Sequence, residues 1–337
     1  MKIDSTLPMD IAATKEAARS AEQAGYDGLW AGETKHEPFL QLLQAAEATE
    51  RISVGSAVAI AFARTPMTLA GAGWDLAEYA RGRFILGLGS QVKPHVERRF
   101  SMPWSKPAAR MREFVLAMRA IWACWQHGEK LDFEGEFYTH TLMSPFFTPT
   151  RLEWGPPPVY LAGVGSRMTE VAGEVCDGFF FHAFTTDRYL REVTLPALLR
   201  GRSKAGVEGL DGFTLAGPAF ACVGRDDAEL VAAMKATKER IAFYASTPAY
   251  RPVLDLHGWG ELQPELTKMS RDGRWSEMGA AIDDEILHAF AAVGDPSQVG
   301  KGLRGRWDSV ASRITLYATY TSDPAIWLEV IDAARSE

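Results

Sequence analysis

The stretch Val159–Arg167 (VYLAGVGSR) passes from a short apolar run into a Gly-x-Gly-Ser turn. The run follows three prolines and predicts a buried parallel strand, and the amphipathic segment at 168–175 predicts a helix. In such a strand-to-helix turn, glycines let the backbone approach a ligand, Ser166 caps the helix, and free N–H groups attract an anion such as phosphate. The alternative is an ordinary turn whose glycines only relieve tight geometry.

The composition is that of a folded, acidic protein. Its 337 residues are 47% hydrophobic and 23% charged, so a large core is available. The net charge of −7 argues against nucleic acid as a partner, because no overall positive field would attract a phosphate backbone. The three cysteines form no C-x-x-C pair and are expected to be core residues in a reducing compartment. Since no apolar stretch has the length of a signal core or a membrane span, we expect a cytoplasmic protein without a membrane partner.

Strand-like and helix-like segments alternate along the chain. An Asp-Gly pair introduces an apolar strand after a helix at Asp27 and again at Asp177, which indicates a repeated unit. Strands are predicted to start at eight positions: Lys2, Gly28, Ile52, Arg83, Val159, Gly178, Phe213 and Ile314. Eight strand–helix units in a chain of this length predict a single (β/α)8 domain, a TIM barrel, over residues 1–337.

A doubly wound dinucleotide-binding sheet is the alternative fold. Its fingerprint needs a third small residue after the Gly-x-Gly turn. That position is Met168 after the turn at 163–165 and Val92 after a second turn at 87–89. Neither side chain is small, so the barrel is favoured.

Two segments exceed a minimal barrel. Residues 127–155 contain two short β-like runs around Glu134-Gly135, and residues 246–282 are rich in Pro, Trp and Gly without a long helical period. Such insertions commonly cover the catalytic face, which the carboxyl ends of the strands form. Peripheral decoration is the alternative.

The loop Glu33–Phe39, after the second predicted strand, is dense in titratable side chains. Glu33 and His36 are the predicted catalytic pair, because a histidine beside a carboxylate can donate or accept a proton near neutral pH. The alternative is a hydrogen-bonded surface histidine without a catalytic role. None of the seven histidines has H-E-x-x-H or H-x-H spacing, so no metal site is predicted.

Three further features point to a flat, anionic ligand. Small residues at 55–63 leave an open floor at the end of the third strand, and the second Gly-x-Gly-Ser turn, at 87–90, can face the same ligand as the first. Residues 91–112 hold six positive side chains and one negative, which would attract a polyanionic tail. A solvated helix flank is the alternative interpretation of that basic segment.

Taken together, these segments resemble the bacterial luciferase-like flavin oxidoreductase superfamily. The resemblance covers nearly the whole chain and rests on four stretches, namely Gly25–Trp30, the third strand through Met67, Gly82–Ser90 and Ala162–Ser166. Within the superfamily, Gly89–His95 and Glu33–Phe39 are similar to the branch that uses the deazaflavin coenzyme F420.

The resemblance implies a deazaflavin bound at the barrel mouth, with a non-prolyl cis peptide bond near Ala57-Val58 behind its ring. Some dehydrogenases of the branch place a glutamate just after the fourth strand. Gln91 stands in this region and cannot act as an acid, so their mechanism does not carry over whole. The implied cofactor-binding residues are Ala57, Val58, Arg64, Gly89, Ser90, Gly163, Val164, Gly165 and Ser166.

The implied function is hydride transfer between the deazaflavin ring and a small organic substrate, with His36 or Glu33 moving the proton. An FMN-dependent monooxygenase that uses oxygen is one alternative, and a non-catalytic flavin-binding barrel is another. The basic segment 91–112 favours the deazaflavin, whose tail carries phosphate and carboxylates. Aromatic residues in the two insertions indicate an apolar or aromatic substrate.

A homodimer is also expected, because luciferase-like proteins are commonly dimers. The helices after the second and third strands are candidates for the interface. Their apolar residues include Leu42, Leu43, Met67 and Trp74, which ordinary packing against the barrel explains equally well.

Overall fold

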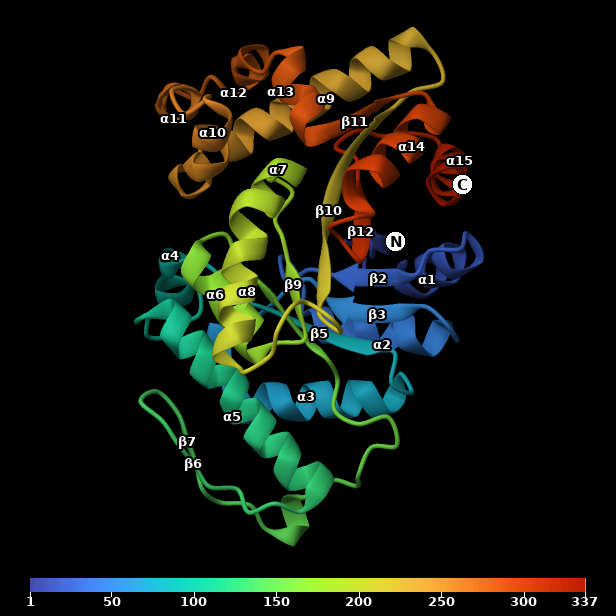
Figure 1. Cartoon of the computed structure of the whole chain (residues 1–337). Helices are drawn as coiled ribbons and strands as arrows, with labels where there is room; N and C mark the ends of the chain where they lie inside the picture. Colours follow the sequence, from blue (N-terminus) through green and yellow to red (C-terminus); the bar gives the residue numbers. More distant parts are fainter. Residues whose placement is uncertain (337) are drawn as a thin grey trace. The chain divides into compact units, whose positions relative to one another are not determined.

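A computed structural model describes residues 1–336 (Figure 1). Its parallel strands pair with one another into a closed barrel. Hydrogen bonding runs around the barrel in the order β1-β2-β3-β5-β8-β9-β10-β12 and returns from β12 to β1. The predicted TIM barrel is therefore confirmed, and every predicted strand start lies within one residue of an observed one. The barrel strands are β1 (Lys2–Thr6), β2 (Gly28–Ala31), β3 (Ser53–Ser56), β5 (Phe84–Gly89), β8 (Val159–Ala162), β9 (Gly178–Phe180), β10 (Thr214–Val223) and β12 (Arg313–Tyr317).

Two strands lie beside the barrel strands. The short β4 (Ala59–Ile60) pairs with the end of β5, and β11 (Ala291–Gly294) pairs in parallel with β10. The strand β11 was not predicted. It forms because β10 is ten residues long and its last residues, Phe220–Val223, offer β11 a parallel edge.

The helices begin at recognisable start signals. Thr65 accepts a hydrogen bond from the Thr68 N–H ahead of α3, and Asp295 forms a reciprocal capping box with Gln298 at the start of α14. Proline stands in the first turn of both helices, where its missing N–H costs nothing. The helices are α1 (Thr14–Gln23), α2 (Pro38–Ala48), α3 (Pro66–Tyr79), α4 (Lys93–Arg98), α5 (Pro107–His127), α6 (Ser166–Val175), α7 (Asp187–Tyr189), α8 (Leu195–Lys204), α9 (Asp227–Ala245), α10 (Arg251–His257), α11 (Leu262–Arg271), α12 (Trp275–Met278), α13 (Asp284–Phe290), α14 (Pro296–Trp307) and α15 (Pro324–Arg335).

The chain forms two compact units. The N-terminal unit comprises Asp4–Phe180 and Ala197–Thr214, and the C-terminal unit comprises Met1–Ile3, Phe181–Pro196 and the chain from Leu215 onward. No helix among residues 1–336 combines the length and apolarity needed to cross a membrane.

The N-terminal unit is held together by apolar strands and by helices packed against one another. Its strand β5 is buried along its whole length, as expected of a parallel strand covered on both faces. Helices α3 and α5 lie side by side, and the rings of Trp74 and Trp125 meet edge to face with centroids 5.3 Å apart. Trp74 is 1% exposed and Leu42 is fully buried, so within the chain both are core residues, whereas Leu43 is 41% exposed.

The insertion at 127–155 contains the predicted pair of β-like runs. They form an antiparallel hairpin of β6 (Phe133–Glu134) and β7 (Thr139–His140). The Glu113 carboxylate on α5 accepts hydrogen bonds from the backbone N–H groups of three hairpin residues, Glu136, Phe137 and Tyr138. These three hydrogen bonds satisfy backbone donors of the hairpin and tie it to the helix.

The C-terminal unit has its own apolar core, in which Phe184, Phe220 and Phe290 are each at most 2% exposed. The insertion at 246–282 belongs to this unit and folds as the short helices α10, α11 and α12. Gly258 and Gly273 interrupt it in the left-handed region, with φ of 80° and 74°. Because each helix is short, no long period is visible in the sequence.

Candidate active site

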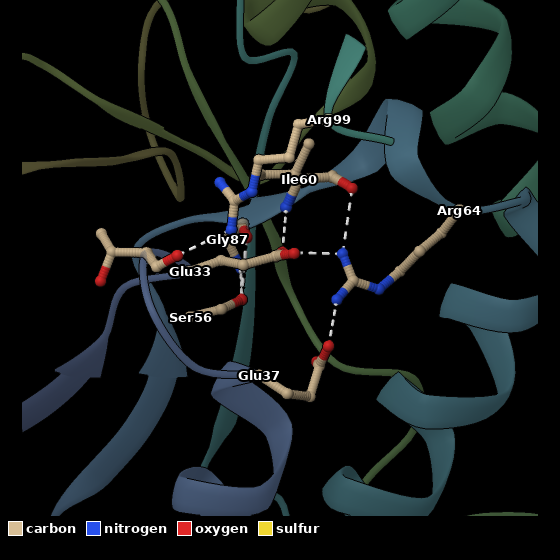
Figure 2. A network of polar contacts seen from close by, with 8 residues as sticks. Glu33, Glu37, Ser56, Ile60, Arg64, Gly87 and Arg99 are labelled. Carbon is tan, nitrogen blue, oxygen red and sulfur yellow. Dashed lines mark hydrogen bonds and ion pairs between the residues drawn. The ribbon is translucent and has the colours of Figure 1, made fainter. Parts of the chain in front are cut away.

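The loop between β2 and α2 is anchored by one arginine (Figure 2). Arg64 Nη1 donates to Glu33 Oε2 at 2.7 Å, and Arg64 Nη2 donates to Glu37 Oε2 at 2.5 Å. The same Glu33 oxygen accepts from the Ile60 N–H at 2.7 Å, and the Ile60 carbonyl accepts from Arg64 Nη1 at 3.1 Å. This network joins the loop after β2 to the segment after β4.

Burial makes this network strong. The Glu33 side chain is 6% exposed and that of Arg64 is 14% exposed, so little water competes for their charges. Burial by itself would lower the pKa of Arg64, but the hydrogen bonds and negative charges of Glu33 and Glu37 outweigh it and raise the pKa. The structure therefore gives Glu33 and Arg64 a positioning contact with each other. Proton transfer by Glu33 and cofactor binding by Arg64 stay predictions.

His36 stands within the same loop. Its side chain is exposed and has no hydrogen-bond partner among residues 1–336. The loop around it is held at three points, because Glu33 and Glu37 bind Arg64 and the Thr34 carbonyl accepts from Arg99 Nη2 at 2.7 Å. An imidazole without a protein partner on a fixed loop is available to a ligand.

A non-prolyl cis peptide bond joins Ala57 to Val58, between β3 and β4. The resemblance led us to expect the bond at this position, and the structure confirms it. Neighbouring backbone groups hold the segment on both sides, since the Ala57 N–H donates to the Ala31 carbonyl at 2.8 Å and the Glu33 N–H donates to the Val58 carbonyl at 3.3 Å. The predicted floor and the predicted catalytic loop thus lie in direct contact.

The turn at the end of β5 is closed by packing. A Cβ atom on Gly87 would lie 1.8 Å from the Ser56 carbonyl oxygen, and one on Gly89 would lie 2.5 Å from Val58 Cγ2. The Ser56 hydroxyl also donates to the Gly87 carbonyl and accepts from the Gly87 N–H (Figure 2). Close packing inside the barrel therefore accounts for both glycines, which is the alternative raised for such turns. Cofactor binding by Gly89 stays a prediction.

Ser90 and the basic segment that follows are engaged with the protein. The Ser90 hydroxyl donates to the Gln91 carbonyl at 3.1 Å. Buried Arg110 donates to Tyr138 and to the Pro103 carbonyl. The remaining partners are Glu97 for Lys93, Thr34 for Arg99, Glu136 for Lys106 and Glu174 for Arg112. Within residues 1–336, Arg98 is the basic side chain of this segment without such a partner. Carboxylates pair with three of the six basic side chains, Lys93, Lys106 and Arg112, so the positive excess of the segment is reduced but not removed.

The turn at the end of β8 is open. A Cβ atom on Gly165 would meet no atom within 4 Å, and its φ of −90° is accessible to any residue. Gly165, rather than Ser166, occupies the N-cap position of α6, and no side chain caps the helix. The predicted Ser166 cap is wrong, because Ser166 is already the first helical residue and is exposed. The first N–H groups of α6 are consequently available to an anion.

Gly163 and Val164 complete this turn. The space beside Gly163 is filled by Met168, whose Cγ would lie 2.9 Å from an added Cβ atom, whereas the Val164 side chain is 37% exposed. Within the N-terminal unit, the predicted residues thus form two groups. The loop and floor around Glu33 contact each other directly, and the open turn before α6 is the second group. Sequence reasoning missed Glu37 and Ile60, for which the only signal was their proximity along the chain to Glu33 and Arg64.

Comparison with known proteins identifies the family of the chain. A family model for luciferase-like monooxygenases matches residues 2–313. The chain belongs to this family. One member, an uncharacterized protein of Mycobacterium tuberculosis, is 52% identical over 314 residues, which are 93% of this chain and 92% of that protein. An F420-dependent glucose-6-phosphate dehydrogenase of Rhodococcus erythropolis is 32% identical over 205 residues, 56% of this chain and 58% of that enzyme.

A solved structure shares the architecture of this chain. The coenzyme F420-dependent tetrahydromethanopterin reductase of Methanopyrus kandleri superimposes with a TM-score of 0.78 over 98% of this chain and 96% of that chain. Sequence identity in this comparison is 20%, so the likeness shows the shared barrel fold.

Proposed function

We propose that this luciferase-like protein is an oxidoreductase that uses coenzyme F420 and transfers a hydride between the deazaflavin ring and a small organic substrate. The observation that carries the proposal is the open turn before α6, which offers uncapped N–H groups and free space to a phosphate. The F420-dependent relatives favour the deazaflavin among phosphate-bearing flavins.

The residues of the open turn fit a phosphate-bearing cofactor. Helix α6 is ten residues long, so its aligned peptide dipoles place partial positive charge at its start. The bare backbone at Gly165 leaves space beside those N–H groups, and the exposed Ser166 hydroxyl is within the same turn. Together with Gly163 and Val164, these residues would hold the phosphate.

The remaining site residues have separable tasks. When bound, the deazaflavin supplies the two-electron hydride chemistry of its ring. The small side chain of Ala57 and the cis-linked Val58 shape the floor, while Arg64 fixes the loop through Glu33. The His36 imidazole can give or take a proton at a ring nitrogen, because no protein group among residues 1–336 engages it. Glu33 serves this reaction by holding the loop.

A second candidate function is an FMN-dependent monooxygenase. The pairing of Lys93, Lys106 and Arg112 with protein carboxylates favours it, because these three side chains are then less available to a long anionic tail. The open turn before α6 accepts the phosphate of either cofactor equally well. The family description also includes monooxygenases.

The test is an equilibrium titration of the purified protein with F420 and, separately, with FMN, followed by fluorescence at low and raised salt. We expect F420 to bind more tightly. Preference for FMN would replace the proposal by the monooxygenase, and binding of neither would overturn both.

The role of His36 is tested with the loaded protein. We expect His36→Ala to abolish turnover in a screen of carbonyl acceptors with reduced F420, while F420 affinity is retained. The matched control is His127→Ala, which removes an exposed histidine at the end of α5. Turnover that survives in His36→Ala would remove its assigned role.

We also propose a homodimer and a cytoplasmic location. The interface would involve exposed residues of α2 such as Leu43, since Leu42 and Trp74 are already buried within the chain. Light scattering of the purified protein and fractionation of cells that produce it test these two proposals.

A further inference from the structure

A cluster of polar aromatic side chains lies in the C-terminal unit, outside the site described above. His182 follows β9 by two residues, Tyr244 belongs to α9, and Tyr250 ends a 3-10 turn in the insertion. The His182 and Tyr250 rings are stacked with centroids 4.6 Å apart, and the Tyr244 ring meets His182 edge-on at 4.7 Å. The cluster is packed against the apolar core of the same unit.

The hydrogen bonds of His182 fix its tautomer. The Phe184 N–H donates to His182 Nδ1 at 3.0 Å, so in the neutral ring the proton resides on Nε2. Nε2 lies 3.2 Å from the Tyr250 hydroxyl oxygen and therefore donates to it. Burial lowers the pKa of His182 to about 4, so the ring is neutral near pH 7.

The O–H group of Tyr250 is consequently free to donate a hydrogen bond. It accepts from His182, and its own O–H has no acceptor among residues 1–336. Burial raises the pKa of Tyr250, so the hydroxyl stays protonated. A hydroxyl that accepts one hydrogen bond donates the next one more strongly, because the bonds polarise each other.

A second polar group nearby in the chain also lacks a partner. The Thr185 residue is 5% exposed, and its hydroxyl makes no hydrogen bond within the described part of the chain. A buried unpaired hydroxyl is costly, and a bound molecule is one way to satisfy it. Thr185 and His182 both lie in the segment that follows the carboxyl end of β9, the end of the strands at which TIM-barrel enzymes bind their substrates.

The chemistry of the cluster selects a neutral ligand. The groups that it offers are hydroxyls and a neutral imidazole. The guanidinium of Arg240 lies over the Tyr244 ring at 5.9 Å, but this side chain is exposed and makes no hydrogen bond to the cluster within residues 1–336. Burying a carboxylate or phosphate against neutral donors would cost more than burying a carbonyl, since no opposite charge compensates for the lost water.

We propose that the Tyr250 hydroxyl, oriented by His182, is a recognition group for the oxygen of a neutral ketone or aldehyde, and that the buried Thr185 hydroxyl, three positions after His182 in the chain, is a second polar group available to such a ligand. Tyr250 is the binding residue and His182 is a positioning residue. This inference rests on the proposed function, for which it names the substrate class.

The test is calorimetric titration of the full-length protein with acetophenone, cyclohexanone and benzoate. Acetophenone and benzoate share a ring and differ in charge. We expect at least one ketone to bind about tenfold more tightly than benzoate, and Tyr250→Phe to lose about five- to tenfold in ketone affinity, the range of one hydrogen bond. The matched control is Tyr79→Phe, which removes a hydroxyl from an exposed tyrosine of α3.

The positioning role of His182 is tested with a double-mutant cycle. We expect His182→Leu to weaken ketone binding as Tyr250→Phe does, and the double variant to show no further loss, because both changes remove the same donor. A purely structural role of His182 would give additive losses and would weaken benzoate binding equally. Circular dichroism verifies that each variant is folded.

The proposal is overturned if neither ketone binds, if benzoate binds as tightly as the ketones, or if Tyr250→Phe leaves ketone affinity unchanged. The same proteins are titrated with F420. Normal F420 binding without a ketone effect would overturn this inference alone, whereas a ketone effect without F420 binding would overturn the proposed cofactor alone.

Discussion

The turns Gly87–Ser90 and Gly163–Ser166 have the same Gly-x-Gly-Ser pattern and opposite environments. At the end of β5, the glycines face the Ser56 backbone and the Val58 side chain at distances that no side chain tolerates. At the end of β8, the second glycine faces open space at an uncapped helix start. The first turn is needed by the barrel, and the second is available to a ligand.

This difference separates two reasons for placing glycine at the end of a strand. A glycine with neighbouring atoms too close for a side chain is required by packing, and its replacement lowers the free energy of unfolding. A glycine with no neighbouring atoms in the protein leaves space for a ligand, and its replacement is expected to weaken ligand binding. The following substitutions test this division.

The largest effect is expected at Gly87. The added Cβ atom of Gly87→Ala would lie 1.8 Å from a backbone oxygen of Ser56, and backbone cannot move aside without disturbing two strands. We expect a loss of about 4 kcal/mol or more in the free energy of unfolding, measured by urea denaturation. The control is Gly71→Ala in α3, where no atom lies within 4 Å and alanine should stabilise the helix by about 0.5–1 kcal/mol. Equal stabilities of the two variants would refute the packing argument.

Gly89→Ala is expected to cost less. Its added Cβ atom would meet Val58 Cγ2 at 2.5 Å, which is a side chain rather than backbone. We expect a loss of about 1–3 kcal/mol, as for other overpacked sites. Combining it with Val58→Ala should recover part of that loss, and a double-mutant cycle measures the coupling. Strictly additive losses would show that the clash is not the cause.

Gly165→Ala should act on binding instead. No atom opposes the new methyl group, so we expect the free energy of unfolding to fall by less than about 1 kcal/mol, the scale of an N-cap change. The methyl group would occupy space beside the α6 N–H groups, and F420 affinity should fall by about tenfold, which corresponds to about 1.4 kcal/mol. Retained affinity in fluorescence titration would mean that the turn does not contact the cofactor.

The smallest effect is expected from the two serines. The Ser90 hydroxyl donates within its own turn, whereas the exposed Ser166 has no partner among residues 1–336. We expect Ser166→Ala to weaken F420 binding by about threefold, less than a full hydrogen bond to a charged group. We expect Ser90→Ala to weaken F420 binding less than Ser166→Ala does, because the Ser90 hydroxyl is already engaged within its own turn. The comparison between the turns fails if the two substitutions have the same effect.

The barrel was predictable because its determinants are local. Buried parallel strands are short apolar runs, and pairs such as Asp27-Gly28 and Asp177-Gly178 mark where they start. The strand β11 was missed because Ala291–Gly294 is too short and too weakly apolar to be recognised without its partner β10. The same holds for the short helices of the second insertion.

The site was predictable at the level of segments and less so at the level of contacts. The Ser166 cap was misassigned by one residue, since the backbone angles at Gly165 decide which position is the N-cap. No ion-pair partners of the basic segment 91–112 could be predicted, because a count of charges along the chain cannot reveal distant carboxylates such as Glu136 and Glu174. Contacts across such distances depend on the folded barrel.

The bridge from Arg64 to Glu33 and Glu37 has a consequence for loop entropy. The two glutamates lie four positions apart on either side of His36, and one planar guanidinium binds both. The backbone from Glu33 to Glu37 and the Arg64 guanidinium thus form a small closed loop. Closing such a loop removes most of the conformations that its backbone would otherwise sample. A residue nearly thirty positions away along the chain thus sets how freely the imidazole moves, and lysine, with a single point charge, could not close the same loop.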